Sequence, residues 1–303
     1  MSMEREEMSF DLEMPSVGVI KGVLAKDIEV VGEKVVNLRT CARPYRNIYS
    51  VAQLRTIKNV IERYGSGKVH LSPRHNLEIP EVRQKDLDRA LKELYIAGLF
   101  PGGAGTSVRN IFTCPHWCPK AVRPVQELGM MVSANFADRD MPNKVTVSFA
   151  GCSNACSRPQ NTDIGVIAVG RVGTGSSGCP DGCTECVEAC PFGAIERAGR
   201  GVRINDKCIY CLKCVDACTD GMLTVEETGF RVLIGGKEGS TVRFGAEYAV
   251  FAGDFEVLEI IERALSSYLK KAEFRPGSAK KKERLGEVVE RLGLEEFMKA
   301  PPA

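Results

Sequence analysis

The sequence predicts a mixed α+β protein that is interrupted by a small cysteine-rich insert. Three observations support this prediction. Stretches of alternating apolar and polar residues, such as DIEVVGEKVVNLR at residues 27–39, are typical of strands, whereas other segments repeat their apolar residues at helical spacing. Twelve of the thirteen cysteines fall into groups, and eight of them lie within residues 179–218. The 303 residues suffice for one large domain or for two to three small ones.

The expected elements follow one another along the chain. Residues 16–40 are expected to form two strands, and Ser50 is expected to cap a helix that ends at Gly65. A strand, a break at Pro73, a second strand and a helix ending near Gly98 come next. The remaining expected elements are strands at residues 144–150, 163–170 and 229–236, and helices at about 255–270 and 281–299.

Composition excludes several classes of protein. The net charge of +2 and the hydrophobic fraction of 44% give no general attraction to nucleic acid. No apolar run approaches the length of a membrane helix, and the charged stretch MSMEREEMSF lacks the apolar core of a signal peptide. We therefore expect a cytoplasmic protein with no nucleic-acid or membrane partner. Thiols stay reduced in the cytoplasm, so the grouped cysteines are expected to bind metal.

The eight cysteines of the insert follow the spacing of a bacterial ferredoxin with two clusters. Each run has two-residue gaps and then a three-residue gap, apart from one extra residue after Cys179 and a Thr219 where a second proline is common. The fourth cysteine of each run is expected to reach the other cluster. One [4Fe–4S] cluster is thus assigned to Cys179, Cys183, Cys186 and Cys218, and the other to Cys190, Cys208, Cys211 and Cys214. A pair of structural zinc sites is the alternative.

The four earlier cysteines form two pairs whose spacing alone would also fit a zinc site: Cys114, Cys118, Cys152 and Cys156. The segments around them are selectively basic. Between Arg39 and Leu77 there are eight Lys or Arg residues and one acid, and between Gly102 and Ala137 there is one acid. We interpret these segments as a pocket for a polyanionic ligand, since arginine makes bidentate contacts with carboxylates. A solvated positive surface is the alternative.

Several segments of the chain resemble sulfite and nitrite reductases. GCSNACSRPQNTDIGVIAVG at 151–170 resembles their siroheme and [4Fe–4S] signature, and VHLSPRHNLEIPEV at 69–82 resembles their strand with an Arg-Gln pair. PGGAGTSVRNIFTC at 101–114 resembles their glycine-rich loop, and ERLGEVVERLGLEEF at 283–297 resembles their C-terminal helix. A ferredoxin module inserted after the second cysteine pair is typical of anaerobic and dissimilatory-type sulfite reductase subunits.

The resemblance covers nearly the whole chain and implies its domain organisation. The chain would be one half of a sulfite/nitrite reductase, with ferredoxin-like and siroheme-binding α+β subdomains, carrying an inserted two-cluster ferredoxin. The implied divisions are a ferredoxin-like subdomain at 1–80, a siroheme/[4Fe–4S] domain at 81–170, the ferredoxin insert at 171–228 and the completion of the siroheme domain at 229–303.

The resemblance also implies the cofactors. All four early cysteines would bind a third [4Fe–4S] cluster, and Cys156 would bridge it to the iron of a siroheme. The first pair departs from the family, because three residues separate its cysteines rather than five and Phe112 holds the usual ligand position. The residues expected to bind the cofactor are Cys156, Arg109, Asn110, Lys120, Arg123 and Asn154.

The family surrounds its substrate with four basic residues. Arg43, Arg74 and Lys144 match three of them. Thr146 stands where a second lysine is usual, and His75 replaces the usual glutamine. The implied activity is that of an oxidoreductase that reduces sulfite to sulfide with electrons from the ferredoxin clusters. The alternatives are reduction of nitrite to ammonia, a siroheme-binding electron-transfer paralogue without sulfite reductase activity, and a polyferredoxin with a structural zinc.

Two partners are expected. The sequence has no NAD or flavin fingerprint, so a separate electron-donor protein is expected. The chain corresponds to about half of the larger single-chain members of the family, which predicts two-fold pairing with itself or with a homologous subunit. Each active site would then take its cysteines from one chain and some arginines from the other.

Overall fold

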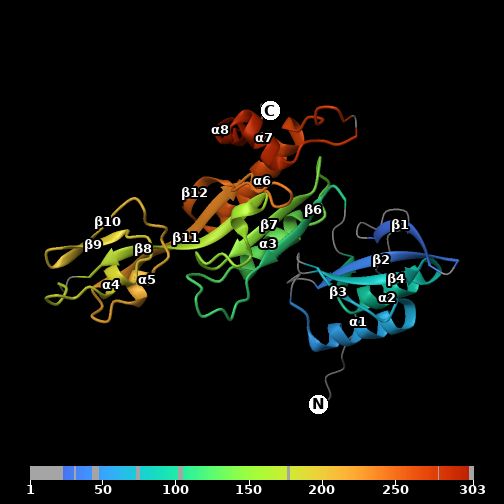
Figure 1. The fold of residues 1–303 in the computed structure, drawn as a ribbon, viewed down its shortest axis with the longest axis horizontal. Coiled ribbons are helices and arrows are strands. Elements are labelled where there is room, and N and C mark those ends of the chain that lie inside the picture. The colour runs from blue at the N-terminus through green and yellow to red at the C-terminus, as the bar shows by residue number, and fades with distance from the viewer. Residues whose placement is uncertain are drawn as a thin grey trace, which may run out of the picture.

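The computed structural model describes residues 23–30, 32–42, 48–72, 76–101, 105–175, 178–278 and 280–299. The predicted substrate residues Arg43 and Arg74, and also Pro73 and His75, lie outside these ranges. Within them, no helix has the length and apolar character needed to cross a membrane. Three bodies follow one another across the molecule: an N-terminal α+β body, a central sheet domain and the ferredoxin-like insert at the far end (Figure 1).

The N-terminal body is an antiparallel sheet with two helices packed against it. Its strands pair in the order β1-β2-β4-β3, and β5 pairs with β2. Leu38 and Ile79 of the sheet are fully buried with Val60 and Leu91 of the helices. The elements are β1 (Val23–Val30), β2 (Glu33–Ala42), α1 (Val51–Tyr64), β3 (His70–Leu71), β4 (Leu77–Arg83), η2 (Gln84–Asp86), α2 (Leu87–Ile96) and β5 (Leu99–Pro101).

Local sequence signals explain the first helix. The Ser50 hydroxyl accepts a hydrogen bond from the Gln53 N–H at 3.1 Å, and the Gln53 side chain accepts one from the Ser50 N–H at 2.9 Å. This reciprocal pair is a capping box. The helix ends before Gly65, as predicted. The core shared by α2 and the sheet reaches Leu99, so this packing unit extends beyond residue 80.

The central domain contains a five-stranded mixed sheet in the order β12-β11-β8-β7-β6. Strands β6, β7 and β8 are parallel, whereas β11 is antiparallel to both of its neighbours. Phe149, Phe230 and Tyr268 are fully buried in the core between this sheet and its helices. The elements are β6 (Val108–Thr113), α3 (Gln126–Phe136), β7 (Val145–Ala150), η3 (Pro159–Asn161), β8 (Ile164–Thr174), β11 (Leu223–Ile234), β12 (Ala246–Ala252), α6 (Asp254–Lys271), α7 (Leu285–Leu292) and α8 (Leu294–Met298).

The insert lies at the end of two long paired strands. Strands β8 and β11 remain paired as far as Thr174 and Leu223, beyond the predicted limits of the strands at 163–170 and 229–236. Gly170 fits against the insert, because a Cβ there would lie 2.5 Å from the Leu212 side chain. The insert contains α4 (Glu185–Glu188), β9 (Ile195–Ala198), β10 (Gly201–Ile204) and α5 (Lys213–Asp216).

The mixed α+β prediction is confirmed, with one correction. The helix predicted over 281–299 is wrong as a single element, because Gly293 has φ +81° and separates α7 from α8. A residue with positive φ cannot continue a right-handed helix. The sequence analysis did not predict β6, α3 or β12.

Candidate functional site

The first and second cysteine pairs meet where two parallel strands end. Thr113 at the end of β6 lies opposite Phe149 near the end of β7, so Cys114 and Cys152 emerge at the same edge of the sheet. Burial raises the pKa of the Cys114 thiol, and the neighbouring Cys152 and Cys118 raise it further. Strand pairing therefore brings three of the four predicted ligands together.

Gly151 makes this approach possible. Its N–H donates to the Cys114 Sγ at 2.9 Å, and its carbonyl accepts from the Val122 N–H at 2.7 Å. A Cβ on Gly151 would stand 2.9 Å from the Arg123 carbonyl oxygen and 3.5 Å from the Cys114 Sγ. Any larger residue would push the two cysteine-bearing segments apart.

Cys156 lines a pocket that the other three cysteines do not line. The turn after Cys152 places Ala155 and Arg158 at φ +50° and +56°, a conformation that is uncommon without glycine and is found at functional sites. Cys156 is exposed and lines a pocket of about 480 Å³ together with Lys144 and Thr146. This volume is in the range of ligand-binding pockets. Two residues predicted for different roles, Cys156 and Lys144, thus share one pocket.

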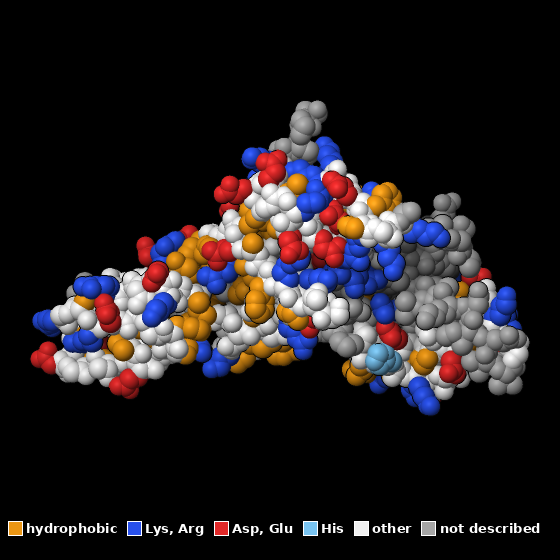
Figure 2. All heavy atoms as spheres, turned by 45° about the horizontal axis from the view of Figure 1, so that its top comes forward, with side chains coloured by type: hydrophobic (Ala, Val, Ile, Leu, Met, Phe, Trp, Pro, Cys, Tyr) orange, Lys and Arg blue, Asp and Glu red, His pale blue; other side chains and the backbone are white. Residues whose placement is uncertain are grey.

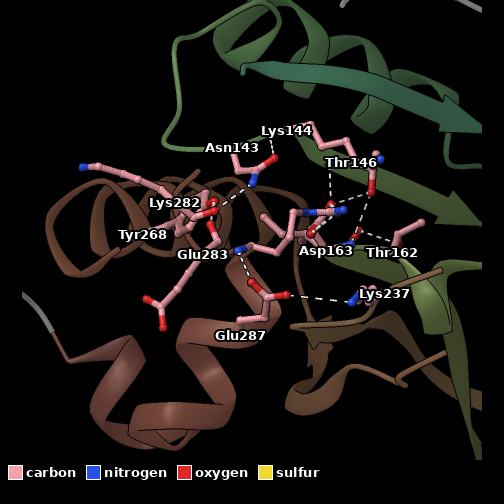
Figure 3. Close-up of polar contacts among 12 residues, drawn as sticks. Asn143, Lys144, Thr146, Thr162, Asp163, Lys237, Tyr268, Lys282, Glu283 and Glu287 are labelled. Carbon is pink, nitrogen blue, oxygen red and sulfur yellow. Dashed lines mark hydrogen bonds and ion pairs between the residues drawn. The ribbon is translucent and has the colours of Figure 1, made fainter. Parts of the chain in front are cut away.

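A buried ion pair forms part of the pocket wall. Asp163, at the start of β8, accepts hydrogen bonds from the Thr146 N–H at 2.9 Å and the Thr146 hydroxyl at 2.7 Å. Arg284, just before α7, donates through Nη2 to both Asp163 oxygens at 2.8 Å. Asp163 is 1% exposed and Arg284 is 8% exposed. Figure 3 shows how Thr146 and Asp163 lie within this network. The sequence analysis did not identify Asp163 or Arg284 as site residues.

The other predicted cofactor residues do not line this pocket. Asn110 is buried, and its side-chain oxygen accepts from the Asn76 amide at 3.3 Å, which links the central domain to the N-terminal body. Arg123 forms an ion pair with Asp254 and lies 4.9 Å from the Phe230 ring centre. Lys120 and Asn154 are exposed, and Arg109 is half-buried with Nη1 3.4 Å from the Gly105 carbonyl oxygen.

Positively charged side chains lie on one face of the molecule and at the pocket. On the face in Figure 2, a band of Lys and Arg side chains crosses the middle of the molecule. Lys144, Arg158 and Arg284 line the pocket with positive charge and Glu238 lines it with negative charge, whereas Asp163 pairs with Arg284 without lining the pocket. With that pair counted as neutral, the described pocket has a surplus of one positive charge, which suits an anionic ligand.

The eight cysteines of the insert converge in two sets. Burial raises the pKa of Cys186, and the nearby Cys179, Cys218 and Cys183 raise it further. A second cavity is lined by the other four, Cys190, Cys208, Cys211 and Cys214. Burial, followed by the effect of Cys211 and Cys208, raises the pKa of Cys214 to about 11. Each set combines three cysteines of one run with one of the other, and their assignment as ligands of two clusters stays a prediction.

The backbone of the insert is shaped around these sets. Tyr210 and Leu212, which lie between the cysteines of the second run, have φ +62° and +61°. Backbone N–H groups point at sulfur: Ala194 donates to Cys190 at 3.3 Å and Leu223 donates to Cys218 at 3.3 Å. Such bonds stabilise thiolates bound to iron. The cysteines of each set are thus neighbours, but among the described residues no three His, Cys, Asp or Glu side chains are arranged to hold a single metal ion.

Comparison with known proteins gives the family. The model for the nitrite and sulphite reductase 4Fe-4S domain matches residues 104–301, and the model for the nitrite/sulfite reductase ferredoxin-like half domain matches residues 39–95. The chain therefore belongs to the nitrite and sulfite reductase family, which confirms the resemblance seen in the sequence.

Relatives and a solved structure agree with this assignment. The chain is 30% identical over 253 residues to the coenzyme F420-dependent sulfite reductase of Methanocaldococcus jannaschii; the match covers 82% of this chain and 40% of that protein. It is 26% identical to the dissimilatory-type sulfite reductase subunit beta of Nitratidesulfovibrio vulgaris, covering 88% and 76% of the two chains. The crystal structure of dissimilatory sulfite reductase I has the same fold, with a TM-score of 0.69, 19% identity, and coverage of 92% and 76%.

Proposed function

We propose that this chain is a cytoplasmic, siroheme-dependent sulfite reductase subunit that reduces sulfite to sulfide. The observation that supports the proposal is the shared pocket, which is lined both by a cysteine predicted to bind a cluster and by a lysine predicted to contact the substrate anion. The names of the relatives favour sulfite over nitrite, since those of Methanocaldococcus jannaschii and Nitratidesulfovibrio vulgaris are both called sulfite reductases.

The cysteines suit three [4Fe–4S] clusters per chain. A cubane takes four thiolates, and the insert offers two sets of four. Cys114, Cys118 and Cys152 converge beside β6 and β7, and Cys156 follows one short turn later. We assign the siroheme to the pocket that Cys156 lines. When bound, it supplies an iron that takes the substrate through sulfur and receives electrons from the adjacent cluster.

The side chains of the pocket would handle charge and protons. Reduction of hydrogen sulfite to hydrosulfide and three waters consumes six electrons and six protons. Lys144, at the start of β7, would hold the oxyanion and neutralise its charge. Lysine and arginine stay protonated at neutral pH, so water held by these side chains would be the immediate proton donor. Arg43 and Arg74 are proposed to complete the anion site from outside the described residues.

A reduced-dye assay tests this proposal. Protein purified without oxygen and loaded with siroheme is supplied with a reduced viologen and with sulfite, and then with nitrite. We expect sulfide to form at a rate that depends on siroheme content. Formation of ammonia from nitrite without sulfide from sulfite would assign the nitrite activity instead. Siroheme absorbance with neither product would indicate the non-catalytic paralogue.

We further propose two-fold pairing with a shared active site, and a separate electron donor. Several relatives are named as subunits, which supports assembly with another chain. Coexpression of a Cys156→Ser chain with an Arg74→Ala chain tests the pairing. In a mixed dimer with shared sites, one site carries both lesions and the other carries neither, so about half of the activity should return. No recovery, or an active monomer by light scattering, would contradict the shared site.

A further inference from the structure

Arg284 has hydrogen-bonding capacity that the described part of the chain does not use. Its Nη2 is committed to Asp163, but its Nε–H is buried and has no partner among the described residues. The side chain lines the same pocket as Lys144 and Cys156. A buried, charged donor without a partner is unfavourable. The guanidinium charge that Arg284 brings to the pocket would attract an anionic oxygen there.

Because residue 146 is a threonine and not a lysine, Asp163 is available to pair with Arg284. A family lysine at 146 would itself extend a cation toward the substrate, whereas the short threonine side chain bonds to Asp163. Asp163 is thereby fixed by β7 and turns both oxygens toward Arg284. The residue that departs from the family pattern is therefore connected to Arg284 through one shared carboxylate.

The backbone around Arg284 is also held in place. The Glu287 side chain accepts from the Arg284 N–H at 2.8 Å. The Tyr268 hydroxyl donates to the Glu283 carbonyl at 2.6 Å, and the Asn143 amide donates to the Lys282 carbonyl at 2.9 Å. Figure 3 shows Asn143, Tyr268 and Glu287 around this segment. Asn143 is next to Lys144, so the loop that carries Lys144 also holds the segment before Arg284 in place.

The start of α7 is seated against the sheet domain. A Cβ on Gly286 would lie 2.2 Å from the Gly235 carbonyl oxygen, so only glycine allows this approach. The arginine is thus preorganised by close backbone packing and by its bonds to Asp163, and little order has to be gained when a ligand binds.

We propose that Arg284 is an anion-binding residue of the pocket and takes the place of the lysine that is absent at position 146. Its guanidinium would donate to an anionic oxygen in the pocket, which the proposed function identifies as an oxygen of the sulfite substrate. A peripheral carboxylate of siroheme offers the same chemistry. The inference rests on the proposed function only for the identity of the oxyanion.

The test uses siroheme-loaded protein purified without oxygen. Siroheme per chain is measured from its absorbance, and sulfite affinity is measured from the change of the siroheme band during titration. Arg284→Gln removes the charge and the guanidinium fork. We expect its sulfite Kd to rise about ten- to a hundredfold, as for a lost hydrogen bond to a charged group, with siroheme content unchanged. Addition of Thr146→Lys to Arg284→Gln should recover most of the affinity.

Two further variants separate binding from folding. Arg284→Lys keeps a positive charge beside Asp163 and should fold, yet it should bind sulfite more weakly than the parent because the fork is lost. Arg139→Gln is the matched control, because Arg139 pairs with Glu262 and does not line the pocket. Its siroheme content and sulfite affinity should equal those of the parent.

The outcomes distinguish sulfite from a siroheme carboxylate as the ligand of Arg284. They also separate failure of this inference from failure of the proposed function. Unchanged sulfite affinity with reduced siroheme content in both Arg284 variants would keep Arg284 as an anion-binding residue and assign its ligand as a siroheme carboxylate. Unchanged values of both quantities would overturn the proposal, as would failure of Thr146→Lys to restore either one. If the parent protein binds siroheme but not sulfite, the proposed function fails, and the siroheme content of the variants still decides the role of Arg284.

Discussion

The insert and the central sheet both collect cysteines, but they do so in different ways. In the insert, short loops with two-residue gaps carry all eight ligands, and the backbone adopts positive φ between them. In the sheet domain, the two pairs are far apart in sequence, and the pairing of β6 with β7 brings them together. The first arrangement depends on local geometry, whereas the second depends on the packing of the whole domain.

The largest effect is expected from a substitution in the sheet domain that stops activity but leaves the clusters of the insert in place. Cys156→Ser should abolish sulfide formation, because the pocket loses the thiolate proposed to connect cluster and siroheme. The two clusters of the insert should stay detectable by EPR, since their ligands are elsewhere. Cys41→Ala, at a buried cysteine outside every group, is the control and should keep all clusters. Sulfide formation at the parent rate in Cys156→Ser would show that the bridging assignment is wrong.

The next prediction tests the dependence of the sheet site on packing. Gly151→Val places side-chain atoms against the Arg123 carbonyl and near Cys114. We expect a loss of about 1–3 kcal/mol in the free energy of unfolding, as for overpacked sites, together with loss of the siroheme-linked cluster. EPR should still show the clusters of the insert. The control is Gly253→Ser, because nothing lies within 4 Å of a Cβ at Gly253.

A smaller effect is expected beside Arg284. Hydrogen bonds from Arg291 hold the pKa of the Glu283 carboxyl below its usual value. Because the folded pKa is the lower one, this stabilisation is present above the unfolded pKa and is lost as pH falls through the folded pKa. Glu283→Gln should cost about 1 kcal/mol at pH 7, and this difference should shrink below about pH 4.5.

Chemical denaturation of parent and Glu283→Gln protein at several pH values measures this effect. Siroheme content should be unchanged, since Glu283 pairs with Arg291 and does not line the pocket. A difference in stability that grows toward acid pH would contradict the lowered pKa of Glu283 in the folded protein.

The contrast between local geometry in the insert and long-range packing in the sheet domain explains which features could be predicted from the sequence. The two cysteine sets of the insert could be predicted from spacing, because each cysteine is positioned by its neighbours in the chain, and their role as cluster ligands stays a prediction. The capping box at Ser50 is likewise local. Helix α3 was missed because QELGMMVSANF is apolar on several sides and has weak helical periodicity. The break at Gly293 was missed because the apolar pattern continues on both sides of it.

The contact between Asp163 and Arg284 could not be read from the sequence. The two residues are joined only when β8, β7 and the start of α7 come together in the fold. Both residues stand inside segments that resemble the family, so that resemblance was the available signal. Spacing gives no information about which distant arginine faces a given carboxylate.

The central claim is that one chain holds both kinds of cysteine site and a siroheme. Iron analysis of protein purified without oxygen, together with its visible spectrum, tests this claim most directly. We predict about thirteen irons per chain, twelve from three [4Fe–4S] clusters and one from siroheme, with siroheme absorbance bands. About eight irons without haem absorbance would mean that only the insert carries clusters, and would contradict the account.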